Sequence, residues 1–578
     1  MTHAFKSSEL LDPQRFEALY GDRLVPCYAE RPHNLDAMLR ESVARCGDAC
    51  ALEEGGRALS YRQLDTAVNQ IATGLQALGV RRGERVALFM GNRLEYTVLL
   101  FGVWRLGAIA VPIGVRQSTN ELDYMLNQCG AAALVTEAAL AHRLPAGSAL
   151  PTVRSVVYCL DTGETLPAPE GADALPAITY EALLSAGHGT PMPADFDDQQ
   201  PACIMYTSGT TGHPKGAVLS HLGFFHTARH YQRRFGYGPD ERMLLVIPGT
   251  HISGLLAVVV VTMQLGGCLV SLREFRVGEV LDTLQAKRIT ATVMVPAMYN
   301  LLVREPDLAQ RDLSAWRVGH FGGAAMPEVT IGRLAELLPQ LELYNGFGAT
   351  ETTSAVTLSE RGDAARYPDS VGTMVPCVDI RVLNPEGHEV PRGEAGELWI
   401  RSPGNAIGYW NNAEATRAAF VAGYWRSGDI GSVDAQGFVR VFDRIKDMIN
   451  RGGYKVYCVE LENVIQRVPS VLEVAAVASP CPVLGERVHI FVHAAYSASP
   501  LTIDALRTFC RAHVADYKLP DILTLNPTPL PRNLNGKLVK APLRDRAREM
   551  AAERASTQPF AQPPQEAADT SVQPHQKG

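Results

Sequence analysis

Residues 206–216 read Tyr206-Thr-Ser-Gly-Thr-Thr-Gly-His-Pro-Lys-Gly216, a short run of hydroxyl and glycine residues that ends with a lysine and a glycine. Glycines allow successive backbone N–H groups to converge on one anion, hydroxyl side chains add donors that rotate, and Lys215 supplies a positive charge. Apolar runs at 202–205 and 217–219 predict two strands joined as a hairpin. The stretch therefore predicts a loop that binds a polyphosphate and is held by two strands.

The spacing of the glycines argues against the commonest phosphate-binding loop. Gly209 is followed by Gly212 and then by His-Pro-Lys215-Gly216, so no Gly-Lys-Ser/Thr triplet closes the run onto a helix. A Walker-type NTPase is therefore disfavoured. Glycine, serine and threonine also dominate flexible linkers, which is the alternative interpretation of the stretch. The apolar flanks argue against a linker because they would hold the loop as a hairpin.

Composition and charge describe an ordinary enzyme with several hydrophobic cores. The 578 residues are 46% hydrophobic and 20% charged, and the formal net charge is -7, so no basic surplus points to nucleic acid. Eleven cysteines without any C-x-x-C pair argue against a disulfide framework or a zinc site and favour a reducing compartment. The N-terminus lacks the apolar core of a signal peptide and no transmembrane segment is expected, so the predicted location is cytoplasmic.

The order of helical and strand-like segments predicts an α/β fold. Ser60 and Gln63 form a capping-box pattern before a periodic apolar segment, and Ser118 and Glu121 open a further helix. Strand-like runs alternate with such helices at 85–89, 108–112, 132–136, 243–247, 291–295 and 317–321. This alternation implies a parallel-type α/β body, to which residues 379–401 add a β-rich part.

Four segments divide the chain. Residues 1–34 are an N-terminal extension, 35–445 a large domain, 446–552 a small α+β domain and 553–578 a disordered tail. The tail is predicted from its many Gln, Pro, Ala, Ser and Thr residues, which cannot bury enough apolar surface. Within the large domain, the apolar stretch 255–272 is interrupted by polar residues and predicts a buried helix followed by a buried strand.

Four further clusters carry more polar chemistry than their surroundings: Tyr344–Thr352, Gly423–Asp429, Asp443–Val456 and Pro529–Lys537. Glu351 could hold Mg²⁺, because this ion prefers carboxylate and phosphate oxygens. Asp429 could accept hydrogen bonds from paired ribose hydroxyls, although a capped turn beside a strand explains the same residues. A solvated linker would explain the charges of the third cluster. In the fourth cluster, a single lysine such as Lys537 is ordinarily a solvent-exposed residue without a specific role.

In this order, the phosphate loop and the four clusters resemble the adenylate-forming superfamily of acyl-CoA synthetases, nonribosomal-peptide adenylation domains and firefly luciferase, over residues 35–545. The resemblance implies a two-step reaction: a carboxylate attacks the α-phosphate of ATP to give acyl-AMP and pyrophosphate, and a thiol then displaces AMP. It also implies ATP, Mg²⁺ and coenzyme A as cofactors, and a small C-terminal domain that is mobile between the two steps.

The resemblance assigns nucleotide-binding roles to residues that match the superfamily's motifs. The β- and γ-phosphates would be bound by Thr207, Ser208, Gly209, Thr210, Thr211 and Lys215. The adenylate would be contacted by Gly323, Ala324, Asn345 at the adenine amino group, and Phe347 by stacking. The remaining contacts would be Thr350 to the α-phosphate, Glu351 to Mg²⁺, Asp429 to the ribose hydroxyls and Arg444 to the ribose and phosphate side.

The same resemblance assigns roles to the small domain. Lys537 would be the catalytic lysine of adenylation, offsetting the charge that develops at the α-phosphate, an effect worth ~10²-fold or more. The small domain would rotate about Lys446, withdrawing Lys537 and presenting the loop of Gly452 and Gly453 to the pantetheine channel of CoA.

The acyl substrate is predicted from the motif after the phosphate loop. Amino-acid-activating members usually place an aspartate there, whereas this chain offers His251, so an α-amino acid is disfavoured. His251 is expected beside the acyl carboxylate, the alternative being a satisfied histidine in an apolar segment. Gly346 and Gly348 stand where acetate-activating members carry a tryptophan, so a medium- or long-chain fatty acid or an aryl acid is expected.

The predicted function is therefore an AMP-forming acyl-CoA ligase whose partners are its carboxylic acid and CoA. The alternatives are a stand-alone adenylating enzyme that loads a carrier protein, and a non-catalytic binding homologue. Retention of the charged motif residues argues against the last. The sequence leaves the oligomeric state open, with a homodimer among the choices, and it excludes nucleic acid as a partner.

Overall fold

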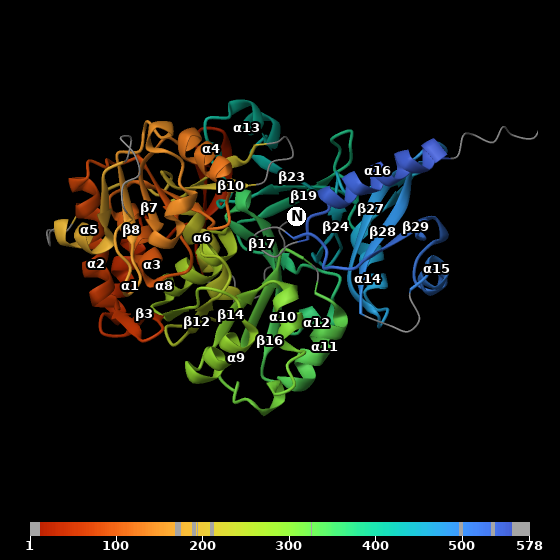
Figure 1. The fold of residues 1–578 in the computed structure, drawn as a ribbon, viewed down its shortest axis with the longest axis horizontal. Helices are drawn as coiled ribbons and strands as arrows, with labels where there is room; N and C mark the ends of the chain where they lie inside the picture. Colours follow the sequence, from red (N-terminus) through yellow and green to blue (C-terminus); the bar gives the residue numbers. More distant parts are fainter. Residues whose placement is uncertain are drawn as a thin grey trace, which may run out of the picture. The chain divides into compact units, whose positions relative to one another are not determined.

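A computed structural model describes residues 12–167, 175–187, 192, 195–207, 213–324, 326–495, 501–532 and 538–557. The chain divides into two compact units (Figure 1). The larger unit contains the chain up to Lys446 and also a short later segment that starts at Arg532. The smaller unit contains Asp447–Pro531 and the residues from Leu538.

The first large sheet of the larger unit has eight strands within the described ranges, mainly parallel, and it holds the hairpin of the phosphate loop. In spatial order its strands are β21 (Gly408–Tyr409), β11 (Lys215–Ser220), β10 (Pro201–Thr207), β6 (Ile109–Ile113), β5 (Arg85–Phe89), β7 (Ala131–Glu137), β8 (Ser155–Cys159) and β9 (Ala177–Thr179). β10 and β11 pair antiparallel, as the apolar flanks of the loop predict.

The second large sheet has nine strands in the described part of the chain, again mainly parallel. Their spatial order is β18 (Thr373–Met374), β17 (Ser354–Leu358), β16 (Glu342–Ala349), β15 (Val318–Gly322), β14 (Ala291–Met294), β12 (Arg242–Leu245), β13 (Cys268–Ser271), β3 (Cys50–Glu54) and β4 (Arg57–Ser60). The β3–β4 hairpin forms one edge of this sheet, although its residues come from near the N-terminus.

The two sheets enclose a common layer of helices because strand residues alternate in direction. On β5, Val86 and Leu88 join the same core as Met243 and Leu245 of β12, together with residues of helices α2, α3 and α6. The neighbouring residues Ala87 and Phe89 face the other side, towards helix α4. This period of two is the physical signature of strands buried on both faces.

The described helices of the larger unit cover both sheets on both faces. They are α1 (Leu35–Cys46), α2 (Tyr61–Ala77), α3 (Leu94–Arg105), α4 (Thr119–Cys129), η1 (Ala138–Arg143), η2 (Gly147–Ala149), α5 (Tyr180–Ala186), α6 (His221–Phe235), α7 (Ile252–Gly254), η3 (Leu255–Val260), α8 (Val261–Leu265), α9 (Val277–Ala286), α10 (Pro296–Leu302), η4 (Leu308–Gln310), α11 (Glu328–Leu337), η5 (Thr350–Thr352), α12 (Asp363–Arg366) and α13 (Ala413–Ala419).

Two smaller antiparallel sheets complete the larger unit. One contains β19 (Asp379–Leu383), β20 (Gly396–Arg401), β23 (Tyr424–Val433), β22 (Phe420–Val421) and β24 (Val439–Arg444). The other is the hairpin of β1 (Gln14–Leu19) and β2 (Arg23–Tyr28), whose inner residues pack on Leu222 of α6.

The smaller unit is an α+β fold with helices on both faces of one sheet. The described strands are β26 (Tyr454–Val456), β25 (Ile449–Arg451), β28 (Gly485–Ala494), β27 (Val471–Cys481) and β29 (Ile522–Asn526). Helices α14 (Cys458–Ile465) and α15 (Ile503–Arg511), followed by η6 (Asp516–Lys518), pack on one face, and α16 (Ala541–Thr557) packs on the other. Because α16 runs to Thr557, the first residues of the expected tail 553–578 are helical; the rest lie outside the described residues.

Most of the local sequence signals are confirmed. Ser60 and Gln63 form a reciprocal capping box on α2, and Ser118 and Glu121 form one on α4. The stretch 255–272 is a buried helix followed by buried β13, as predicted, except that its first part, Leu255–Val260, is a π-helix. The predicted fold class, an α/β large domain with a β-rich part and a small α+β domain, is confirmed.

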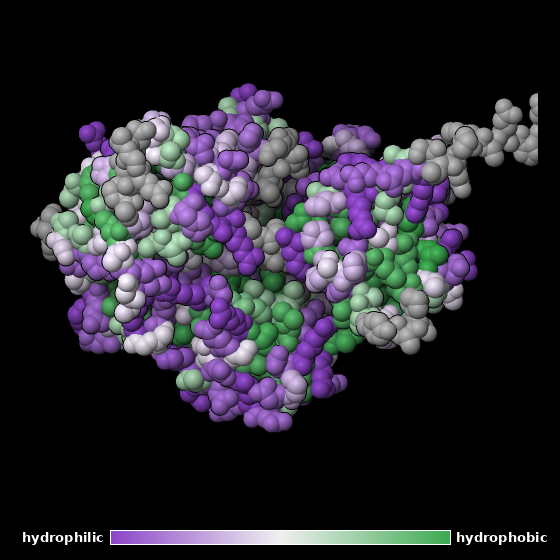
Figure 2. Space-filling view, viewed as in Figure 1, coloured by the Kyte–Doolittle hydropathy of each residue, from purple (hydrophilic) through white to green (hydrophobic). Residues whose placement is uncertain are grey.

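The face of the larger unit seen in Figure 2 is mainly polar. Polar residues cover most of the face that Figure 2 shows for this unit, with apolar residues gathered in smaller patches. Among the described residues, no helix combines the length and apolar character needed to cross a bilayer.

His320 is a titratable group placed by this packing at the centre of the core. It lies on β15, only 5% exposed, with its ring against Tyr231 and Phe235. Neither ring nitrogen has a hydrogen-bond partner among the described residues. Burial lowers the pKa of His320 from 6.5 to about 3, so the ring is neutral in the folded protein at ordinary pH.

We predict that His320 makes the protein less stable as the pH falls below 6.5. In that range the unfolded chain binds a proton at this residue and the folded chain does not, until the pH approaches 3. The loss at pH 5 amounts to about 2 kcal/mol of unfolding free energy. Denaturant unfolding of His320→Phe at pH 7.5 and 5 should therefore show a smaller pH effect than the parent. Exposed His388, replaced in the same way, is the control, and equal pH effects in both variants would contradict the prediction.

Candidate nucleotide site

Glu351 is the centre of the candidate site in the larger unit. Its Oε1 atom accepts hydrogen bonds from Thr207 Oγ1 at 3.3 Å and from the hydroxyl of Tyr409 at 3.0 Å. Lys215 lies with its Nζ atom 5.3 Å from the centre of the Tyr409 ring. Three residues expected at the phosphates or Mg²⁺ are therefore brought together, and Tyr409 joins them.

Strand pairing explains why these side chains meet. Thr207 ends β10 and lies directly opposite Lys215 at the start of β11. β11 pairs on its other side with β21, which carries Tyr409. Glu351 comes from the second large sheet, in the short helix η5 after β16, and its carbonyl accepts a hydrogen bond from the Ala406 N–H just before β21. The site thus lies where strand ends of two sheets meet.

The environment of Glu351 fits a divalent cation. Glu351 is only 8% exposed, and its carboxylate accepts hydrogen bonds from two hydroxyl groups; no ion pair to it is found within the described residues. A buried carboxylate without a paired cation is costly unless a metal or a cationic ligand group approaches it. Carboxylate and hydroxyl oxygens are the donor set that Mg²⁺ accepts, so the residues present fit this ion.

A second part of the candidate site lies on the β23–β24 pair. Asp429 and Arg444 are directly opposite each other in the antiparallel register, and Arg444 Nε lies 3.2 Å from Asp429 Oδ1. Asp429 is 6% exposed, whereas the side chain of Arg444 is half exposed. The pair presents one acceptor and one forked donor side by side, which suits a ligand with both hydroxyl and phosphate groups.

The glycines of β16 are required by the sheet itself. A side-chain carbon on Gly346 would lie 2.7 Å from His320 Nε2, and one on Gly348 would lie 1.9 Å from the carbonyl oxygen of Ser354. Protein atoms therefore fill the positions that side-chain carbons on Gly346 and Gly348 would take. Any contribution of the two glycines to an acyl pocket stays a prediction.

The other residues expected around the adenylate lie at nearby strand ends. Asn345 is buried on β16, and its side-chain amide donates to the Ser370 carbonyl at 2.9 Å. Phe347 is partly buried next to the core of the small β sheet, and Thr350 starts η5. Gly323 and Ala324 follow β15, which pairs with β16 so that Gly322 lies opposite Gly346.

His251 lies between β12 and α7, in the larger unit. It caps the first turn of α7, where its Nδ1 atom accepts a hydrogen bond from the Ser253 N–H at 3.4 Å. The π-helix η3 follows directly, and π-helical turns are frequent at functional sites. The backbone before His251 is anchored, because Tyr96 donates to the Gly249 carbonyl at 2.6 Å.

The remaining predicted residues divide between the smaller unit and segments outside the described ranges. Gly452 and Gly453 form the turn between β25 and β26, both with positive φ angles (60° and 92°) that favour glycine. Lys446 is the last residue of the larger unit before the chain enters the smaller one. Ser208, Gly209, Thr210, Thr211 and Lys537 lie outside the described residues.

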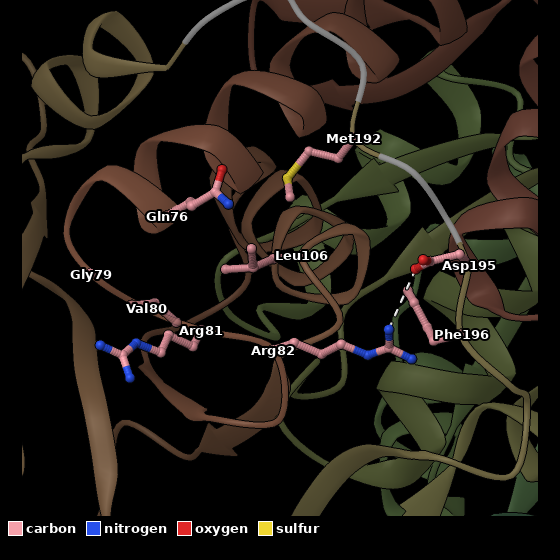
Figure 3. Close-up of a pocket in the computed structure, with 9 residues that line it drawn as sticks. All are labelled: Gln76, Gly79, Val80, Arg81, Arg82, Leu106, Met192, Asp195 and Phe196. Carbon is pink, nitrogen blue, oxygen red and sulfur yellow. Dashed lines mark hydrogen bonds and ion pairs between the residues drawn. The ribbon is translucent and has the colours of Figure 1, made fainter.

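A surface pocket of about 420 Å³ lies elsewhere in the larger unit, near the end of α2 (Figure 3). Its lining includes Arg81, Arg82 and Phe196, and Arg82 Nη1 lies 3.4 Å from Asp195 Oδ1. None of the residues expected to bind nucleotide lines this pocket, so the pocket does not bear on the reaction.

Sequence reasoning missed Tyr409. The residue stands in a Gly-Tyr-Trp stretch that carries no acid, base or phosphate-loop pattern, so no sequence signal marks it. Only the pairing of β21 with β11 places its hydroxyl on Glu351 and its ring beside Lys215. Burial, followed by the nearby Glu351 charge, raises the pKa of Tyr409, so the phenol stays protonated and donates.

Comparisons with known proteins agree with this geometry. Residues 39–410 match the family of AMP-binding enzymes, and residues 460–537 match the AMP-binding enzyme C-terminal domain. The long-chain-fatty-acid CoA ligase FadD13 of Mycobacterium tuberculosis is 34% identical, covering 84% of this chain and 93% of that protein. A feruloyl-CoA synthase of Amycolatopsis sp is 33% identical, covering 86% of this chain and 96% of that protein.

A solved structure, the anthranilate CoA ligase AuaEII in complex with anthranoyl-AMP, has the same fold, with a TM-score of 0.82 and 27% identity over 90% of this chain and 98% of that one. The chain therefore belongs to the AMP-binding enzyme family. The resemblance to adenylate-forming enzymes of the acyl-CoA synthetase branch, stated from the sequence motifs, is confirmed.

We predict that Tyr409→Phe weakens binding of Mg-ATP by about tenfold. The variant removes a hydrogen bond to a carboxylate, and such a bond contributes on the order of 1.5 kcal/mol. Isothermal titration calorimetry with Mg-ATP measures the effect. Tyr237→Phe is the matched control, because the Tyr237 hydroxyl is buried without a hydrogen-bond partner among the described residues. An affinity for Tyr409→Phe equal to that of the control would exclude a role in positioning Glu351.

Proposed function

We propose that the protein is an ATP-dependent acyl-CoA ligase, which activates a carboxylic acid as acyl-AMP and transfers the acyl group to CoA. The observation that carries the proposal is the convergence of Thr207, Lys215 and Glu351 at the junction of two sheets, in a chain that belongs to the AMP-binding family. This arrangement offers hydroxyl donors, one cation and one carboxylate to a single polyphosphate.

In the first step, the loop from Thr207 to Thr211 and Lys215 holds the β- and γ-phosphates while the substrate carboxylate attacks the α-phosphate. Glu351 would hold Mg²⁺, which when bound would offset the negative charge of the phosphates. Asp429 accepts hydrogen bonds from the ribose hydroxyls, and Arg444 beside it binds the ribose and phosphate side. Pyrophosphate leaves, and acyl-AMP remains.

The adenine is held by the β16 segment. Phe347 stacks on the ring, Asn345 bonds the amino group, and Gly323 and Ala324 line the adenylate. Thr350 donates to the α-phosphate. Support for this placement comes from the described strands: β15 and β16 run parallel, with Phe321 opposite Asn345 and Gly322 opposite Gly346, just before Gly323 and Ala324.

Lys537 stabilises the charge that develops at the α-phosphate during the first step. In the second step the smaller unit turns about Lys446, and the turn of Gly452 and Gly453 lines the path of the CoA pantetheine, whose thiol displaces AMP. The position of Lys446 at the end of the larger unit and the positive φ angles of both glycines support these roles.

The substrate is proposed as a medium- or long-chain fatty acid or an aryl acid, with His251 beside its carboxylate. The two relatives, a long-chain-fatty-acid CoA ligase and a feruloyl-CoA synthase, include one member of each class. The anchored backbone before His251 and the buried π-helix after it support a shaped site at this position.

A second candidate is a stand-alone adenylating enzyme that loads a carrier protein, since both functions share the first step.

We place the enzyme in the cytoplasm. None of its eleven cysteines, all within the described ranges, forms a disulfide, which suits a reducing compartment.

A panel of acids distinguishes these functions. We predict pyrophosphate release from Mg-ATP with linear, branched or aromatic carboxylic acids, with acyl-CoA appearing only when CoA is present. Coupled detection of pyrophosphate, AMP and thioester measures both steps. Release that stalls at acyl-AMP with every active acid would overturn the CoA ligase in favour of carrier loading, and no release with any acid would contradict both.

Separate assays of the half-reactions test the roles in the smaller unit. Lys537→Ala should lower adenylation by ~10²-fold or more and leave thioester formation from supplied acyl-AMP intact, because only the first step passes through a pentavalent α-phosphate. Gly453→Trp should show the opposite defect, since an indole would fill the thiol path. Each variant is the control for the other, and equal losses in both half-reactions would refute domain alternation.

A further inference from the structure

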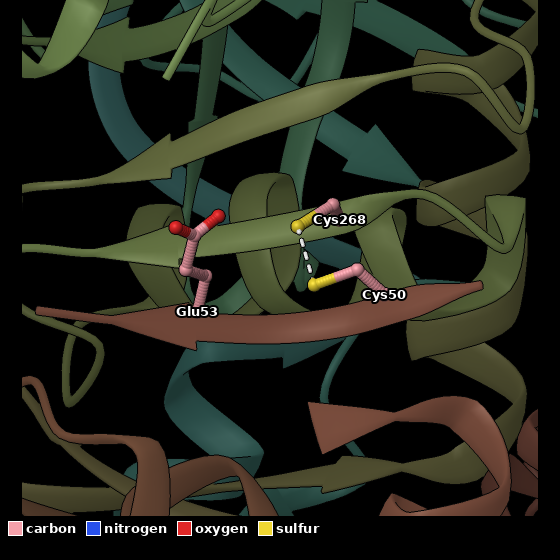
Figure 4. Close-up of side chains that lie close together, drawn as sticks. All are labelled: Cys50, Glu53 and Cys268. Carbon is pink, nitrogen blue, oxygen red and sulfur yellow. Dashed lines mark hydrogen bonds between the residues drawn. The ribbon is translucent and has the colours of Figure 1, made fainter. Parts of the chain in front are cut away.

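Two cysteines lie side by side in the second large sheet of the larger unit, away from the nucleotide site. Cys50 begins β3 and Cys268 begins β13, and their Sγ atoms are 3.4 Å apart (Figure 4). Glu53 points to the same place, so that the ligand atoms of all three side chains lie within 4.8 Å of one another. Cys268 is 5% exposed and Cys50 is partly exposed.

A bulge in β3 brings these groups together. In the pairing with β4, Cys50 lies opposite Ser60 and Leu52 opposite Leu59, so β3 contains one extra residue, Ala51. In a regular strand, side chains three residues apart point to opposite faces, which would separate Cys50 from Glu53. The extra residue turns Cys50 to the face of Cys268 and Glu53. The bulge is therefore the structural cause of the thiol pair.

The charges around the pair favour a thiolate at Cys50. Cys268 Sγ donates a hydrogen bond to Cys50 Sγ, and Arg242 and Lys287 add positive charge nearby. Together these lower the pKa of Cys50 below the usual range of a thiol. The pKa of Cys268 is raised, because it donates this hydrogen bond and is buried. One thiol is thus nucleophilic and its neighbour is protonated.

The same surroundings disfavour a metal ion. Both oxygens of Glu53 are already bound to cations: Lys287 Nζ donates to Oε1, and Arg242 Nη2 donates to Oε2 at 2.6 Å. A divalent cation would have to displace them or lie beside two positive charges. Two thiols and one occupied carboxylate also fall short of the four ligands of a structural zinc site.

We propose that Cys50 and Cys268 form a site of reversible oxidation, at which a low-molecular-weight disulfide such as glutathione disulfide converts the two thiols into an intramolecular disulfide. The Cys50 thiolate attacks one sulfur of the oxidant, forming a mixed disulfide and releasing one thiolate. Cys268 then loses its proton and attacks Cys50 Sγ, releasing the second thiolate. Two protein thiols are oxidised, and one small disulfide is reduced to two thiols.

The product is within reach of small side-chain movements. A disulfide needs an S–S distance of about 2.05 Å, so the sulfurs must approach by about 1.4 Å from their present separation. The bond would fasten the β3–β4 hairpin at the edge of the sheet to β13, two segments more than 200 residues apart in sequence. Oxidation therefore links the β3–β4 hairpin covalently to β13, its neighbour in the same sheet.

The test incubates the full chain with glutathione disulfide and follows intact mass and peptide maps. The parent should lose about 2 Da, with Cys50 and Cys268 joined in one peptide pair, and dithiothreitol should reverse the change. Cys268→Ser should stop at a stable glutathione adduct on Cys50. Cys50→Ser should remain unmodified, because Cys268 is buried and protonated. Cys46→Ser, which removes another partly buried thiol of the same region, should behave as the parent.

Thermal unfolding provides a second measurement. The oxidised parent should melt at a higher temperature than the reduced parent, and this difference should vanish in both Cys50→Ser and Cys268→Ser. A disulfide that joins Cys46 to Cys50, or equal reactivity of Cys50→Ser and Cys268→Ser, would overturn the proposal. Stoichiometric Zn²⁺ that protects both thiols, without disulfide formation by glutathione disulfide, would overturn it in favour of a metal site.

Discussion

The contact of Glu351 with Thr207 and Tyr409 is the constraint on which the candidate nucleotide site depends. It joins residues from the ends of two different sheets, and it involves a buried carboxylate that accepts hydrogen bonds from two hydroxyl groups. The two hydroxyl donors offset part of the cost of burying this carboxylate, and a bound cation would offset more of it.

This contact exists because the two large sheets share one layer of helices. Alternating residues of β5 and β12 face that layer, and the packing sets the sheets at the separation that brings Thr207 to Glu351. The centre of the second sheet is tightly filled: Gly346 has no side chain because His320 occupies the space beside it. A neutral buried imidazole and a glycine in the nucleotide motif are thus parts of the same packing arrangement.

In the same sheet, the bulge in β3 brings two thiol groups together. One extra residue at Ala51 turns Cys50 to the face of Cys268, where neighbouring cations favour its thiolate. Alternation along a strand would have kept these groups apart. Strand bulges change which side chains meet, and a thiol pair separated by more than 200 residues has no signature in the sequence.

The sequence by itself determined the family, the alternation of helices and strands, and the capping boxes of α2 and α4, because these follow from local patterns of apolar, capping and glycine residues. It also identified Glu351, Asp429 and Arg444 as site candidates through their motifs. Only the tertiary structure decided that Tyr409 binds Glu351, that Asp429 pairs with Arg444, and that Gly346 serves packing against His320. These depend on pairing between distant strands, which no local pattern encodes, and the shape of the acyl site depends on tertiary packing for the same reason.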